Sequence, residues 1–196
     1  MHQAWIIAGP NGSGKTTLTR RHLAGKLPVI NPDEIAKALN SANPEDPSTA
    51  MRAGRQALAL QKQYLSEHRS FALETTFSGN REAALMKDAK AAGYKVNLVF
   101  VCTDTPLISM GRIVSRVADG GHHVPGDDVQ RRYQRSLANL PAGLVLADRA
   151  WILDNSSTRM RLIASIERGQ VKSMTNNQPR WVRNLFGRIR LSAPEP

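Results

Sequence analysis

Eight consecutive residues near the N-terminus are the part of the sequence whose types and spacing most clearly specify chemistry. Residues 9–16 match the pattern G-x-x-x-x-G-K-[ST] at every fixed position. Glycines allow consecutive backbone N–H groups to turn toward one anion, and the helix expected to follow directs its positive dipole end at the same point. Lys15 would reach the β- and γ-phosphates of a nucleotide, and the Thr16 hydroxyl would complete the ligand shell of Mg²⁺. The predicted nucleotide-binding residues are Gly9, Pro10, Asn11, Gly12, Ser13, Gly14, Lys15, Thr16 and Thr17.

Two carboxylates that follow predicted strands are candidates for work beside the nucleotide. Asp33 comes shortly after the strand expected at 29–30, where it could accept a proton from an acceptor hydroxyl or cap the helix that follows. Glu74 follows the strand expected at 71–73 and could hold Mg²⁺ through water, bind the acceptor, or pair with a nearby cation. Parallel sheets bind ligands at this strand edge, which favours a functional role for Glu74 and leaves both roles of Asp33 open.

Basic side chains are concentrated after the fourth predicted strand, on two predicted helices joined by a glycine-bordered loop at 120–126. The arginines are Arg112, Arg116, Arg131, Arg132 and Arg135. Two basic helices joined in this way can form a lid, here at about 112–135, that closes over phosphates and contributes arginines to the transferred group. The alternative is a solvated basic face. His122 lies in the loop and is counted among the candidate substrate-binding residues.

The apolar segments alternate between short strands and helices. Strands are predicted at 4–8, 29–30, 71–73, 96–102 and 150–153. Helices are predicted at 15–24, 34–39, 48–67, 81–92, 106–118 and 128–140. This alternation predicts a three-layer α/β sandwich with a parallel sheet of about five strands and helices on both faces.

The composition is that of a globular protein with excess positive charge. Among 196 residues, 27 Lys and Arg stand against 16 Asp and Glu, a formal net charge of +11 that favours anionic partners. Cys102 is the single cysteine, which excludes a disulfide framework within the chain and suits a reducing compartment. No apolar run approaches the roughly 18 residues that a membrane-spanning helix needs, and the N-terminus lacks a signal-peptide pattern. We therefore expect a cytoplasmic location.

The charge divides the chain into a predicted catalytic domain at 1–158 and a basic C-terminal segment at 159–196. The segment carries eight Lys and Arg against two Glu, and its residues 180–191 could form an amphipathic helix with Trp181 and Leu185 on one face. Docking onto a partner, a membrane surface or nucleic acid is one interpretation. A frayed tail, or a helix packed on its own domain, is the other.

Taken together, the motifs resemble the zeta-toxin family of P-loop kinases over roughly residues 4–156, in particular its small bacterial members. The resemblance rests on 9–17, Asn31-Pro32-Asp33-Glu34, Glu74-Thr75-Thr76, Gly93-Tyr94, Arg116, 120–125, Arg131-Arg132-Tyr133, 136–140 and Asp154-Asn155-Ser156. It implies a P-loop kinase-like fold and an ATP- and Mg²⁺-dependent kinase. In the best-known branch the acceptor is the 3′-hydroxyl of UDP-N-acetylglucosamine, and an epsilon-type antitoxin restrains the enzyme.

The resemblance also assigns roles to individual residues. It places the catalytic base on Asp33, phosphate-contacting arginines on Arg116 and on Arg131 or Arg132, and an acceptor-contacting threonine on Thr76. Two departures concern the acceptor side. Residues 57–60, Ala-Leu-Ala-Leu, lack the carboxylate that this branch carries there, and Phe77-Ser78-Gly79 replaces a loop that contains an arginine.

The function predicted from these observations is transfer of the ATP γ-phosphate to a hydroxyl of a small anionic acceptor, with a UDP-N-acetyl sugar as one candidate. A polynucleotide 5′-hydroxyl is an alternative acceptor suggested by the net charge. Aromatic residues make up only 5% of the chain, so platforms on which bases could stack are few. A nucleotide-dependent binding module that acts through a partner, without catalysis, is the remaining alternative.

Overall fold

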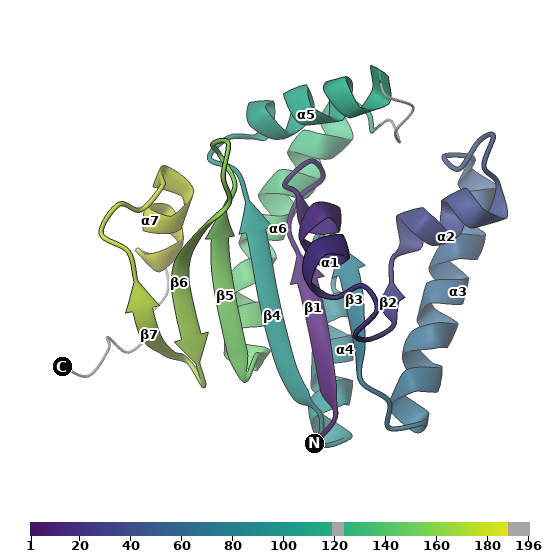
Figure 1. The fold of residues 1–196 in the computed structure, drawn as a ribbon, viewed down its shortest axis with the longest axis horizontal. Helices are drawn as coiled ribbons and strands as arrows, with labels where there is room; N and C mark the ends of the chain where they lie inside the picture. The colour runs from purple at the N-terminus through teal and green to yellow at the C-terminus, as the bar shows by residue number, and fades with distance from the viewer. Residues whose placement is uncertain (119–123, 188–196) are drawn as a thin grey trace.

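The computed structural model describes residues 1–118 and 124–187, which form one seven-stranded sheet with flanking helices (Figure 1). The strand order is β2-β3-β1-β4-β5-β6-β7. The first five strands are mutually parallel, and β6 and β7 are antiparallel to their neighbours. The strands are β1 (Gln3–Ala8), β2 (Val29–Ile30), β3 (Phe71–Thr75), β4 (Lys95–Cys102), β5 (Arg149–Asp154), β6 (Arg161–Glu167) and β7 (Gln170–Met174).

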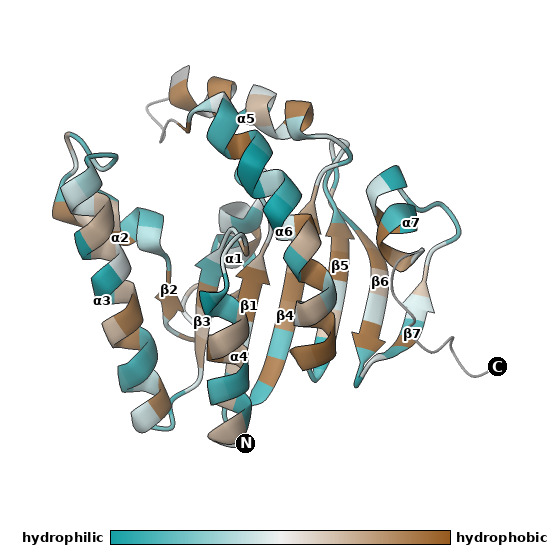
Figure 2. Ribbon diagram, turned by 180° about the vertical axis from the view of Figure 1, so that it is seen from behind, coloured by the Kyte–Doolittle hydropathy of each residue, from teal (hydrophilic) through white to brown (hydrophobic). Residues whose placement is uncertain are grey.

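Helices lie on both faces of the sheet, as predicted. In Figure 1, α1 lies in front of the sheet and α4 and α6 lie behind it, and Figure 2 shows α4 and α6 from their own side. The helices are α1 (Lys15–His22), α2 (Pro32–Leu39), α3 (Pro47–Ser66), α4 (Arg81–Ala91), α5 (Pro106–Ala118), α6 (Gly126–Leu146) and α7 (Arg180–Phe186). The α/β class and the parallel arrangement of the predicted strands are confirmed.

The predicted count of about five strands is too low, because a hairpin after residue 160 extends the sheet. Arg168 and Gly169, with φ of 49° and 77°, form the two-residue connection between β6 and β7. Positive φ at both positions is the mark of the tight hairpin turn whose twist matches antiparallel strands. Because β6 pairs with β5, the predicted division at residue 158 falls between two hydrogen-bonded strands.

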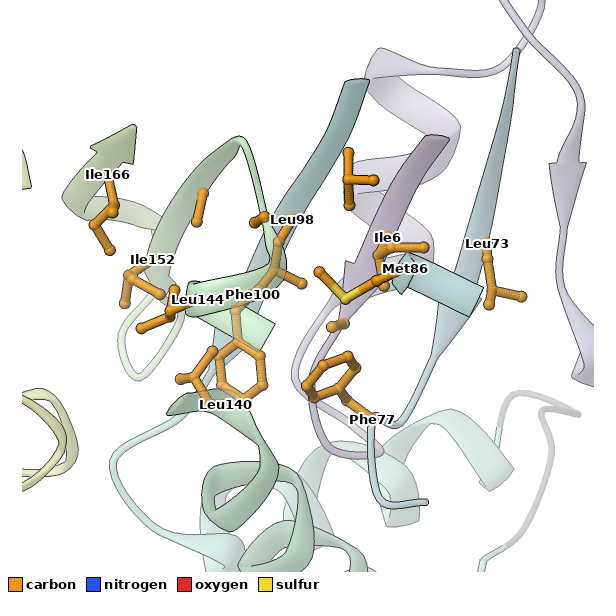
Figure 3. Packing of buried hydrophobic residues seen from close by; sticks show 14 of the residues in the cluster. Ile6, Leu73, Phe77, Met86, Leu98, Phe100, Leu140, Leu144, Ile152 and Ile166 are labelled. Atoms are coloured by element: carbon orange, nitrogen blue, oxygen red, sulfur yellow. The ribbon is translucent and has the colours of Figure 1, made fainter. Parts of the chain in front are cut away.

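The main core lies between the sheet and the helices α4 and α6 (Figure 3). Ile6, Leu98 and Phe100 point toward it from the strands, and Met86 and Leu140 meet them from the helices. The opposite face buries Ile7, Val99 and Val101 in a smaller cluster. Strands buried on both faces read as nearly continuous apolar runs, which is why β1 and β4 were recognisable in the sequence.

The helix α6 continues to Leu146, past the end predicted at residue 140. Pro141 lies inside it, where its ring removes one backbone donor, a change that often ends or kinks a helix. Packing compensates, because Leu144 is fully buried and Gly143 leaves room for the ring of Phe77. A Cβ at residue 143 would lie 2.7 Å from that ring.

The described part of the C-terminal segment packs on its own sheet. Trp181, Val182 and Leu185 of α7 are buried in the main core, and the Trp181 ring lies 6.0 Å from that of Phe100. Residues 188–191 of the predicted helix lie outside the described residues. Within the described ranges, none of the helices combines the length and apolar character needed to cross a membrane.

Candidate active site

The loop between β1 and α1 adopts a conformation that glycine alone permits at key points. Gly9 has φ of +139°, and a Cβ there would lie 1.9 Å from the Val101 carbonyl oxygen of β4. Gly12 has φ of +73° and lies against Ser109 of α5. The backbone of the loop therefore approaches its neighbours more closely than any side chain would allow, and Asn11 and Ser13 are buried within it.

Lys15 and Thr16 begin α1 at the edge of the sheet where β1 ends. Lys15 is only 8% exposed, and its Nζ donates to the Pro10 carbonyl at 2.8 Å, which folds the side chain back over the loop. The Thr16 hydroxyl donates to Glu74 Oε1 at 2.5 Å. Thr17 is exposed on the same turn. The motif thus assembles the geometry of an anion-binding loop followed by a helix N-terminus.

Glu74 is the last residue but one of β3, beside β1, and accepts the hydroxyl of Thr16. It is 6% exposed, and its second carboxylate oxygen, Oε2, has no hydrogen-bond partner among the described residues. A buried carboxylate oxygen without a donor is costly unless a ligand or water supplies one. The hydroxyl of Thr16 and the carboxylate of Glu74 are hard oxygen donors of the kind that Mg²⁺ prefers, so they fit that ion.

Asp33 lies in the first turn of α2, but it does not cap the helix. Asn31 performs that role, because its Oδ1 accepts from the N–H groups of Asp33 and Glu34 at 3.0 and 3.4 Å. The Asp33 carboxylate is exposed, and among the described residues no hydrogen bond or ion pair engages it. Its neighbour Glu34 pairs with Arg20 at 2.7 Å. Of the two roles that the sequence left open, capping belongs to Asn31.

The loop after β3 directs its side chains in different directions. Thr75 donates from its hydroxyl to Glu82 Oε1 at 2.5 Å, and the hydroxyls of Thr76 and Ser78 lie 2.8 Å apart. Phe77 is buried in the main core, and the segment Phe77-Ser78-Gly79 supplies no charged side chain to this loop. Thr76 is half-buried at the same edge of the sheet as Glu74.

The predicted lid arginines lie in different environments. Arg132 donates from Nη1 to Asn11 Oδ1 at 3.4 Å, which places it beside the nucleotide loop. Arg131 pairs with Asp128 at 2.7 Å on the exposed side of α6. Arg112 donates to the Ser157 carbonyl at 3.1 Å. Arg116 lies in α5, but its side chain, like His122 and the connection at 119–123, lies outside the described residues.

Asn155 is a site residue that sequence reasoning quoted without assigning it a role. It follows β5, and its Nδ2 donates to the Ser13 carbonyl at 2.8 Å, which ties the nucleotide loop to the next strand end. The rule that polar residues after parallel strands face the ligand site could have singled it out. Cys102, by contrast, is buried in the core, and burial raises the pKa of its thiol to about 12, so it remains protonated at neutral pH.

Solved structures with low sequence identity share this fold. The AvrRxo1-ORF1:ORF2 structure with ATP matches with a TM-score of 0.72 and 17% identity, covering 100% of this chain and 65% of that one. This chain thus spans about two thirds of that chain's length. A structure of the PezAT toxin–antitoxin system of Streptococcus pneumoniae matches with a TM-score of 0.68 and 18% identity, covering 96% and 80%. These structures share the P-loop kinase-like α/β fold that the resemblance predicts for this chain.

A sequence relative and a family model complete the comparison. An uncharacterized protein of Haemophilus influenzae is 36% identical over 132 residues, which cover 67% of this chain and 93% of the relative. A family model described as an AAA domain matches residues 5–141, a span that includes the nucleotide loop, Asp33, Glu74 and most of α6. The chain therefore belongs to this AAA domain family.

Proposed function

We propose that the protein is an ATP-dependent phosphotransferase that uses Asp33 as the base toward a hydroxyl acceptor. The observation that carries the proposal is the uncommitted carboxylate of Asp33 after β2, on the same sheet edge as the nucleotide loop after β1. Because β3 alone separates β1 from β2 in the sheet, the two strand ends lie close together. A kinase requires this juxtaposition of phosphate site and base.

In the proposed reaction the acceptor oxygen attacks the γ-phosphorus of ATP. The new bond forms between that oxygen and phosphorus, the bond from phosphorus to the β–γ bridging oxygen breaks, and ADP leaves. The hydroxyl proton passes to the Asp33 carboxylate. Lys15 and backbone N–H groups of residues 11–16 hold the phosphates, and Arg132, whose Nη1 lies 3.4 Å from Asn11 Oδ1, faces the same loop.

Thr16 would hold Mg²⁺ directly and Glu74 would hold it through a water molecule. The ion, when bound with ATP, neutralises charge that develops on the β- and γ-phosphate oxygens. The orphaned Oε2 of Glu74 supports this assignment, because a coordinated water would supply the donor that it lacks.

The acceptor proposed on these grounds is small and anionic, and a UDP-N-acetyl sugar belongs to this class. Lys15 and the arginines near the loop would favour a negatively charged compound. A partner protein is part of the same proposal, because the AvrRxo1 structure is a complex of two proteins and PezAT is a toxin–antitoxin system.

The test is an untargeted search for phosphorylated compounds after the protein is incubated with γ-labelled ATP, Mg²⁺ and a small-metabolite extract. A parallel reaction contains a 5′-hydroxyl oligonucleotide at low salt, where electrostatic binding of nucleic acid is strongest. We expect label in the metabolite fraction. Label in the oligonucleotide alone would identify a polynucleotide kinase, and tight ATP binding without label in either fraction would indicate a binding module.

Replacing Glu74 with glutamine is expected to raise the Mg²⁺ concentration required for half-maximal turnover by about 10- to 100-fold, the usual effect of removing an outer-shell partner of a metal. The measurement is turnover against Mg²⁺ at saturating ATP. Glu67→Gln is the matched control, because Glu67 is an exposed carboxylate bonded only to Gln63 on the surface of the molecule. An unchanged Mg²⁺ requirement in Glu74→Gln would contradict the assignment.

A further inference from the structure

A cavity of about 160 Å³ is lined by Pro32, at the start of α2, and by none of residues 9–16 of the nucleotide loop. Its lining includes Gly54, Ala57 and Leu58 of α3 and the first two residues of α4. Pro32 directly precedes Asp33. The cavity therefore borders the residue that precedes the proposed base, at the end of the sheet where β2 and β3 finish.

Glu82 gives this cavity a carboxylate of which one oxygen lacks a hydrogen-bond partner among the described residues. One carboxylate oxygen, Oε1, accepts the Thr75 hydroxyl, and the other, Oε2, is buried without a hydrogen-bond partner among the described residues. Since Thr75 fixes the orientation of the carboxylate, Oε2 is held in place. A buried charged acceptor in this state is stabilised by a ligand that donates a hydroxyl or amine hydrogen.

Arg81 places a cation beside that carboxylate. It is exposed and lines the same cavity. Among the described residues it forms no ion pair with Glu82 or with another acid. Its guanidinium carries donors in a planar fork that suits phosphate or carboxylate groups. The cavity thus combines a buried acceptor for hydrogen-bond donors, Glu82 Oε2, with an exposed cation for an anionic group, the Arg81 guanidinium.

The wall formed by α3 sets the size of the ligand. It carries small side chains there, because Ala57 lines the cavity and a Cβ added to Gly54 would meet nothing within 4 Å. The cavity is nevertheless smaller than the roughly 300 Å³ at which pockets for drug-sized ligands begin. A ligand of monosaccharide size fits this volume better than a complete sugar nucleotide or an oligonucleotide does.

We propose that this cavity binds the acceptor of the proposed kinase, and that the acceptor is a compact sugar phosphate or polyol phosphate. Its hydroxyls would donate to Glu82 Oε2, its phosphate would face Arg81, and the reacting hydroxyl would face Asp33. Glu82 and Arg81 are then the residues that determine acceptor specificity. The inference rests on the proposed function, since it names the substrate class of the same site.

The test measures ATP-dependent phosphorylation of a defined panel that contains free hexoses, hexose and pentose phosphates, inositol phosphates, UDP-N-acetylglucosamine and a 5′-hydroxyl oligonucleotide. With the best acceptor, Glu82→Gln is expected to raise the acceptor KM about 10- to 100-fold and to leave the ATP KM unchanged. Arg81→Met should reduce the preference for the phosphorylated acceptor over its unphosphorylated parent by a similar factor. The matched controls are Asp88→Asn and Lys87→Met, on exposed positions of the same helix.

A second variant tests the cavity without removing a polar contact. Gly54→Leu should fill the free space beside residue 54 and raise the acceptor KM at least tenfold. Because leucine has a higher helix propensity than glycine, the substitution should not weaken α3. Ala59→Leu, on an exposed position of α3, is its control.

The outcomes separate this inference from the proposed function. If a panel compound is phosphorylated in an Asp33-dependent reaction but Glu82→Gln and Gly54→Leu leave its KM unchanged, the cavity is not the acceptor site and the kinase assignment stands. Preference for the UDP-sugar or the oligonucleotide over every compact phosphate would also overturn the inference alone. No phosphorylation of any compound, either in the panel or in a metabolite extract, would overturn both.

Discussion

Replacing Asp33 with asparagine is expected to lower kcat for the acceptor reaction by about 10²- to 10⁴-fold, the usual contribution of a positioned general base. Asparagine keeps the size and shape of the side chain but cannot take the proton from the attacking hydroxyl. Since Asn31, and not Asp33, accepts the N–H groups at the start of α2, the helix should remain intact. The measurement is a single-turnover rate with saturating ATP and acceptor.

Glu34→Gln is the matched control, because Glu34 is the next residue and its carboxylate is engaged by Arg20 on the surface. We expect its kcat to change by less than about twofold, in keeping with the small value of exposed ion pairs. ATP affinity should be the same in both variants and in the parent protein, because neither side chain belongs to the nucleotide loop. Unchanged turnover in Asp33→Asn would show that another group accepts the proton.

The part of the fold that could be predicted is the part whose signals are local. Residues 9–16 specify a glycine-rich turn through their own types, and β1 and β4 appear as apolar runs because they are buried on both faces. The hairpin of β6 and β7 was missed because its turn is Arg168-Gly169, not one of the common Asn-Gly or Asp-Gly pairs. The basic character of the segment also suggested a tail.

In the candidate site, sequence reasoning could propose only the residues that lie at or just after the ends of predicted strands. Asp33 and Glu74 were proposed because they lie at the ends of predicted strands. The bond from Asn155 to the Ser13 carbonyl depends on how the loop after β5 approaches the nucleotide loop. Glu82 gave no signal, because an acidic residue in the first turn of a helix ordinarily serves the helix dipole. Its role depends on the cavity between α3 and α4, which is a tertiary feature.

The charge of the C-terminal segment is also partly explained by tertiary contacts. Arg161 of β6 pairs with Asp154 at 3.2 Å, and this carboxylate is only 1% exposed. Asp154 also accepts from the Ser156 hydroxyl at 2.5 Å and from the Trp181 indole at 3.1 Å. The segment therefore covers the buried carboxylate of Asp154, the residue before Asn155. At least one of its basic residues, Arg161, has a partner within the chain.

Replacing Trp181 with alanine is accordingly expected to lower the free energy of unfolding by about 3–5 kcal/mol, the range for removing a large buried aromatic side chain. The ring is 4% exposed and packs near Phe100, so its removal leaves a cavity in the main core. It also removes one of the three donors to the buried Asp154. Trp181→Phe should cost less, about 1–3 kcal/mol, because it keeps most of the packing and loses the indole N–H.

Urea denaturation monitored by circular dichroism measures these changes, with Arg180→Ala as the control because Arg180 is exposed on the same helix. The control should change the free energy of unfolding by less than about 0.5 kcal/mol. Since Asp154 lies next to Asn155, which holds the Ser13 carbonyl, Trp181→Ala should also weaken the thermal stabilisation that ATP gives to the folded protein. A loss below about 1 kcal/mol in Trp181→Ala would mean that α7 is not part of the cooperative core and would favour the interpretation of a frayed tail.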